Sequence, residues 1–156
     1  MTFSMSWSNS SGEILTRSLS GSDIPTDTRI LQSPTDSLRA IGGTTDFVID
    51  NPLEGIISSE ISFFCSWEAS GYWFGSKIVM PTDFIHMGYS PYYQIAGAVN
   101  APSSEDDIEW RTPVTDPSMT YVYSSAEDQL PGGLNIRCIP VAGGTTFQLQ
   151  INVTKT

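Results

Sequence analysis

The chain has 156 residues, 39% of them hydrophobic and 15% charged, and its seventeen acidic and seven basic side chains give a net charge of −10. This length favours one globular domain over residues 1–156, and the acidic field with its scattered basic residues argues against direct, tight binding of nucleic acid. No apolar run approaches the roughly 20 residues that cross a bilayer, and the N-terminus lacks a secretory pattern, so we expect a soluble protein. Without such a signal, the glycosylation sequons at Asn9 and Asn152 are expected to be chance matches.

Alternation of apolar and polar residues with a period of two runs through the chain, whereas helical periodicity is hard to find. In chain order this pattern predicts strands at residues 2–8, 13–19, 28–32, 46–49, 61–67, 72–80, 92–99, 120–123, 134–140 and 146–155. Turns rich in Gly and Pro separate them. Eight to ten short strands with this spacing predict an all-β fold, an antiparallel β-sandwich of jelly-roll or another Greek-key type.

The most aromatic segment is Ser62 to Pro81, which reads SFFCSWEASGYWFGSKIVMP. The small residues and Gly71 of EASG favour a tight turn, so the segment is expected to form a central hairpin with Trp67 inward. Three roles stay open for the aromatic side chains here and downstream: core packing, contact with another subunit, and contact with a sugar or lipid. The candidate interface or ligand residues are Tyr72, Trp73, Phe74, Tyr89, Tyr92 and Tyr93.

A long connection follows the strand expected at residues 92–99. Its segment SSEDDIEW is expected to open a short helix, because Ser103 or Ser104 can cap it with acidic residues in the first turn. Pro113 and Pro117 then predict an extended, irregular path.

Residue types that support catalysis are scarce. His86 is the single histidine, and its surroundings, DFIHMGYSPYY, match no known nucleophile context, so we expect no enzyme. Cys65 and Cys138 are expected to be buried and reduced, with one disulfide between them as the alternative, and one histidine with two distant cysteines is poor material for zinc. The acidic clusters lack the calcium-loop pattern and the Gly-rich pieces lack that of a phosphate loop, so no metal and no cofactor is expected.

Three segments in order carry a family resemblance. FSMSWSNSSGEIL (residues 3–15), GSKIVMPTDFIHMGYSPYYQI (75–95) and GGLNIRCIPVAGGTTFQLQINVTKT (132–156) resemble the first strand, the central stretch and the closing strands of picorna-like virus capsid proteins. The sequence departs from that pattern where Ile85 separates Phe84 from His86 and where Tyr89 replaces a basic residue. The section from 86 to 132 is also short for a complete capsid jelly roll, and a basic arm is missing.

The resemblance implies a structural capsid or projecting capsid-surface protein of the virion, assembled in the host cytoplasm. It would act by symmetric self-assembly with its own copies or sister capsid subunits, with a receptor on the host surface as a further partner. A weaker resemblance links NSSGEIL and SGYWFGSKI to aegerolysin-like and actinoporin-like pore-forming proteins, which implies a soluble or secreted protein that contacts membranes. The third alternative is a lectin-like carbohydrate-binding module in which Trp73 stacks on sugar.

Overall fold

The computed structural model describes residues 1–51, 60–69, 71–81, 91–115, 119–124, 133–143 and 146–155. Within these ranges the chain is built from strands and one 3₁₀ turn, which confirms the all-β prediction. The strands are β1 (Thr2–Asn9), β2 (Leu15–Asp23), β3 (Arg29–Gln32), β4 (Ser37–Leu38), β5 (Gly43–Asp50), β6 (Ile61–Ala69), β7 (Tyr72–Met80), β8 (Tyr92–Ala98), β9 (Tyr121–Ser124), β10 (Leu134–Gly143) and β11 (Thr146–Lys155). Only β4 was missed, because two residues are too few to show a period.

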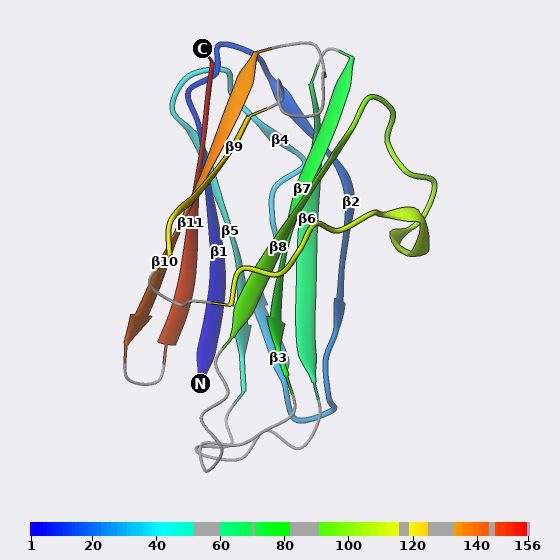
Figure 1. Ribbon diagram of the computed structural model, residues 1–156. Helices are drawn as coiled ribbons and strands as arrows, with labels where there is room; N and C mark the ends of the chain where they lie inside the picture. The colour runs from blue at the N-terminus through cyan, green and yellow to red at the C-terminus, as the bar shows by residue number, and fades with distance from the viewer. Residues whose placement is uncertain are drawn as a thin grey trace.

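The strands form two sheets that face each other, as Figure 1 shows. Sheet A has the order β3-β5-β1-β11-β10-β9, and sheet B has the order β4-β2-β6-β7-β8. The chain alternates between the sheets from β1 to β6, and two meanders, β6-β7-β8 and β9-β10-β11, then complete one sheet each. The predicted β-sandwich is therefore present.

One strand pair departs from the antiparallel pattern. β1 pairs with β5 in the antiparallel sense, but it pairs with β11 in the parallel sense, with Trp7 opposite Ile151. Parallel neighbours are permitted here because the first and last strands are joined through the rest of the chain and not by a tight turn. The sandwich is thus mostly antiparallel, whereas a jelly roll is antiparallel throughout.

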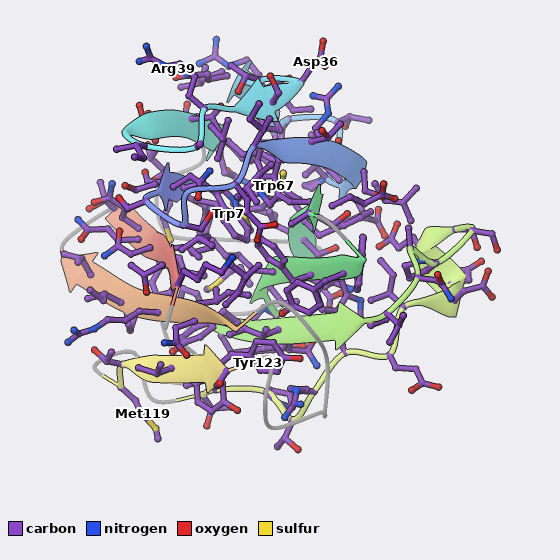
Figure 2. The ribbon with its side chains drawn as sticks, turned by 90° about the horizontal axis from the view of Figure 1, so that it is seen from above. Trp7, Asp36, Arg39, Trp67, Met119 and Tyr123 are labelled. Carbon is purple, nitrogen blue, oxygen red and sulfur yellow. The ribbon has the colours of Figure 1, made fainter. Side chains whose placement is uncertain are left out.

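The main core lies between the sheets and is filled by the inward residues of each alternating strand. Trp7 of β1 and Trp67 of β6 meet edge to face, with ring centroids 5.9 Å apart, and lie side by side in the interior in Figure 2. The last strand is as expected: its inward residues are all buried, namely Phe147, Leu149, Ile151 and Val153. Burial of each such side chain contributes about 1.5–3 kcal/mol, so the burial of these inward residues is the main driving force for the fold.

The loops at one end of the sandwich are tied together by Asn9, the last residue of β1. Its side chain is fully buried: Nδ2 donates to the carbonyl oxygens of Glu13 (2.8 Å) and Arg39 (2.9 Å), and Oδ1 accepts from the Ser11 amide and hydroxyl. The β1–β2 loop and the β4–β5 turn are thereby fixed against each other. The Asn9 amide is committed to these bonds, so this sequon has no accessible acceptor in the folded protein.

The helix expected after Ser103 is a single 3₁₀ turn, Glu105–Asp107, with Ser104 at its N-cap position. The hydroxyls of Ser103 and Ser104 donate to the Asp107 carboxylate at 2.8 and 3.0 Å, and these bonds lower the pKa of Asp107. They do not cap the backbone. The turn ends at Ile108 because this residue is extended and buried against sheet B, which stops the helical path.

Candidate functional site

The aromatic segment at residues 62–81 forms the expected hairpin of β6 and β7. Ala69 pairs with Tyr72 next to the turn, Ile61 pairs with Met80 at the far end, and Gly71 in the turn has a φ of +73°. That backbone conformation favours glycine over residues with a Cβ. The prediction that Trp67 points inward is confirmed, since its side chain is fully buried in the main core.

Three of the candidate contact residues belong to the main core. Tyr72, Phe74 and Tyr93 are 2%, 0% and 1% exposed, respectively, and the Tyr72 and Phe74 rings stack at 5.3 Å. The Tyr93 hydroxyl donates to the carbonyl oxygen of Met119 at 2.8 Å. Of the roles that the sequence leaves open, the structure gives these three residues core packing, and they offer no surface to a partner.

Trp73 is also buried, but it lies on the outer face of sheet B and not in the main core. There it joins Phe64, Ala96 and Ile108 in a second hydrophobic cluster, and it is only 1% exposed. The connection after β8 covers this cluster, and its Trp110 ring meets Phe64 edge to face at 6.0 Å. Trp73 therefore has no free ring face for a sugar in this structure.

The remaining candidates lie at the start of β8 and in the segment before it. Tyr92 is half-buried on β8. Tyr89 and His86 fall in residues 82–90, outside the described part of the chain. Among the five candidates that the structure describes, four are buried in two separate clusters, so these five do not form one exposed surface.

Both cysteines are free and buried, as expected. Burial raises the pKa of the Cys65 thiol to about 12 and that of the Cys138 thiol well above its usual range. Because the reactive species is the thiolate, neither residue is suited to nucleophilic chemistry in the folded state.

We expect the native protein to react with a disulfide reagent such as dithionitrobenzoate at least about 100-fold more slowly than the unfolded chain, since both thiols need an opening of the core to react. The measurement is the release of chromophore with and without denaturant. The unfolded chain should titrate two thiols, and rapid titration of either one in native buffer would contradict this placement.

The described residues show few features of a metal site or a membrane anchor. Among them, no group of three or more His, Cys, Asp or Glu side chains is placed to hold a metal ion. In the same ranges, no helix is long and apolar enough to cross a membrane.

Exposed large apolar side chains are distributed unequally between the two sheets. Within the described residues the strands of sheet B carry none, whereas sheet A carries Ile30 and Leu31 on β3, Val122 on β9 and Val141 on β10, each 45–56% exposed. Met119, just before β9, is 51% exposed and points outward in Figure 2. β3 and β9 are the two edges of sheet A, so apolar surface is present at both of its sides.

A cavity of about 420 Å³ lies beside the edges of β8 and β9, where the connection after β8 crosses in front of that strand in Figure 1. It is lined by Ile95 of β8, Tyr121 of β9 and four residues of the connection: Trp110, Arg111, Thr112 and Val114. Ile95 is buried in the main core, Thr112 is exposed, and the other four are half-buried. The cavity therefore combines two aromatic residues with a guanidinium and hydroxyl groups.

The connection is held against β8 by hydrogen bonds along the strand. The Arg111 amide donates to the carbonyl oxygen of Ile95 (2.9 Å), the Val114 amide donates to that of Tyr93 (2.9 Å), and the Gln94 side chain donates to that of Arg111 (2.9 Å). These bonds occupy the outer edge of β8. They also fix the cavity wall without a regular strand or helix, as predicted from Pro113, whereas Pro117 lies outside the described residues.

Two ring contacts fix the side chains of the wall. The Arg111 guanidinium lies over the Tyr123 ring, 4.6 Å from its centroid. The ammonium of Lys77 lies over the Trp110 ring, 5.8 Å from its centroid.

No protein-family model matches the chain, and no curated protein matches it. The functional assignment therefore depends on the surfaces described above.

Trp110 is the aromatic residue that sequence reasoning missed. It stands alone between an acidic stretch and Pro113, away from the aromatic clusters at 62–74 and 89–93 that drew attention. The position of Trp110 in the sequence could have marked it as a candidate. A single Trp in a polar, Pro-containing connection needs a surface to pack on, and such connections often carry binding residues.

Proposed function

We propose that the protein is a structural subunit that works by binding copies of itself, as a capsid or capsid-surface protein of a virus particle. The observation that carries this proposal is the exposed apolar surface at both edges of sheet A. The motif resemblance over residues 3–15, 75–95 and 132–156 supports the viral assignment, while the parallel pairing of β1 with β11 sets the fold apart from a strict jelly roll.

β3 is the clearest contact element at these edges. All four of its residues are exposed. Ile30 pairs with Ile49, and Gln32 pairs with the next residue of β5, Val48. Leu31 is therefore an extra residue without a partner in β5. A bulge of this kind interrupts the regular row of edge hydrogen bonds. Contact through β3 would thus come from the Ile30 and Leu31 side chains packing on a neighbour, more than from strand addition.

Sheet B offers less at its edges. β4 has only two residues, and the outer edge of β8 already bonds to Arg111 and Val114. A contact between the β3 edge of one copy and the β9 edge of the next is head to tail, and a repeated head-to-tail contact builds a ring when its rotation closes. Burial of apolar side chains at such a contact provides the driving force.

The rest of the outer face of sheet A suits an assembled surface. The outward residues at its centre are uncharged and polar, including Ser4, Ser6 and Ser8 on β1 and Gln148, Gln150 and Asn152 on β11. Together with the net charge of −10, this surface disfavours adhesion to nucleic acid during assembly.

We expect the purified protein to form concentration-dependent oligomers in light scattering and electron microscopy, and two variants to weaken their formation. The double substitution Ile30→Lys with Leu31→Lys blocks the β3 edge, and Val122→Lys blocks the β9 edge. Each should weaken self-association on the order of 30-fold, the factor that corresponds to about 2 kcal/mol at a contact centre. Mixing the two variants should restore a dimer and nothing larger, since each retains the edge that the other lacks.

The control is Ile41→Lys, at a side chain that is 77% exposed in the β4–β5 turn and outside both edges. It should assemble like the unchanged protein, and all variants should keep the same melting temperature within a few degrees. A strict monomer at every concentration would refute the proposal, and pelleting of that monomer with liposomes would instead favour the membrane-binding alternative.

A further inference from the structure

We propose that the cavity between β8, β9 and the connection at residues 110–114 binds one or two sugar rings of a glycan. This inference goes beyond self-assembly and uses different side chains, but the two sites meet at β9, where Tyr121 lines the cavity and Val122 belongs to the assembly edge. The proposed sugar-binding residues are Trp110 and its neighbours, and not Trp73, because Trp73 is buried.

The size and shape of the cavity fit a small ligand. Its volume of about 420 Å³ falls within the range of roughly 300–1,000 Å³ that is usual for ligand pockets. Thr112, one of its lining residues, is exposed, so the cavity lies at the surface of the molecule.

The groups that line the cavity match both faces of a sugar ring. The C–H groups of a pyranose pack on aromatic side chains, which the half-buried Trp110 and Tyr121 provide. Sugar hydroxyl oxygens accept hydrogen bonds, and two of the lining residues, Arg111 and Thr112, carry side chains that can donate them. Among the described lining residues there is no carboxylate.

The wall is organised before any ligand arrives. Hydrogen bonds from Arg111 and Val114 to β8 fix its backbone, the Tyr123 ring orients the guanidinium, and Phe64 and Lys77 position the Trp110 ring. A site that is already ordered loses less conformational entropy on binding, which is how shallow pockets achieve measurable affinity. Gly97 contributes too: a Cβ there would collide with the Tyr123 side chain, so β8 leaves room for this ring.

The test is a printed array of oligosaccharides built from neutral hexoses, N-acetylhexosamines, uronic acids and sialic acids, followed by calorimetric titration of the strongest hit. We expect binding that Trp110→Ala reduces at least about tenfold. Because Trp110→Ala also removes the contact with Phe64, a second variant is needed. Arg111→Lys keeps the charge and the backbone bonds but loses the planar fork of donors, and it should weaken the same glycan at least about fivefold.

Val99→Ala is the matched control, since Val99 is 52% exposed at the start of the same connection but does not line the cavity. It should bind as the unchanged protein does, and so should the β3 variant that carries Ile30→Lys with Leu31→Lys. No hit on the array would overturn the inference, as would binding that survives both Trp110→Ala and Arg111→Lys in cooperatively folded protein. Either result would leave the assembly proposal untouched.

Discussion

Leu149→Asp is expected to leave the protein unfolded in buffer. Leu149 is fully buried at the centre of sheet A, opposite Met5 on β1 and Pro140 on β10, and the described structure places no cationic partner at this position. An aspartate there either buries an unpaired charge or is protonated at high cost, and it also removes the packing of the leucine. The combined loss exceeds about 5 kcal/mol, which is comparable with the whole stability of a domain.

Circular dichroism and urea unfolding measure this effect directly. Gln150→Asp is the matched control, because the neighbouring side chain is exposed on the opposite face of the same strand. It should change the free energy of unfolding by no more than about 0.5 kcal/mol. A soluble Leu149→Asp protein with an unchanged cooperative transition would show that β11 is placed wrongly.

Asn9→Ala is expected to lower the free energy of unfolding by about 3 kcal/mol, because buried amide bonds are lost and their partners are left unsatisfied. The carbonyl oxygens of Glu13 and Arg39 and the Ser11 amide would each lose a partner that is 2.8–3.1 Å away. For a chain of this length the melting temperature should fall by roughly 6–12 °C.

Asn152→Ala provides the comparison, since Asn152 is the other sequon asparagine but lies half-buried on the outward face of β11. Its substitution should shift the melting temperature by no more than about 2 °C. Equal shifts for the two variants would mean that the Asn9 side chain does not join the two loops.

The outer face of sheet B shows what the alternation of residues in a strand can predict and what it cannot. In the sequence, Phe64 is the lone large apolar group opposite the core face of its strand, and Trp73 has the same relation to Tyr72 and Phe74. A period of two assigns such residues to the outside, but it cannot say what covers them. Ile108 and Trp110 do so from a connection more than 30 residues further along the chain, and only the folded arrangement brings them together.

The cavity and the sheet edges are likewise tertiary. Ile95, Trp110 and Tyr121 come from β8, the connection and β9, and no local pattern relates them. Ile30 and Leu31 read as ordinary strand residues in the sequence, and they become a surface feature only because β3 lies at an edge of sheet A. Long-range pairing decides which strands are edges, and alternation carries no information about it.

The sequence by itself determined the all-β class, the approximate positions of ten strands and the burial of the inward residues, because side-chain alternation is a local consequence of extended backbone geometry. The strand ends were less well predicted: β2 runs to Asp23 and β5 begins at Gly43, whereas the predicted strands were 13–19 and 46–49. The tertiary structure alone decided the order of strands in the two sheets, the parallel pairing of β1 with β11, the burial of Trp73 and the cavity around Trp110. These features depend on which distant segments bury apolar surface against each other. The free energy of that burial comes from many long-range contacts, and no short stretch of the chain contains them.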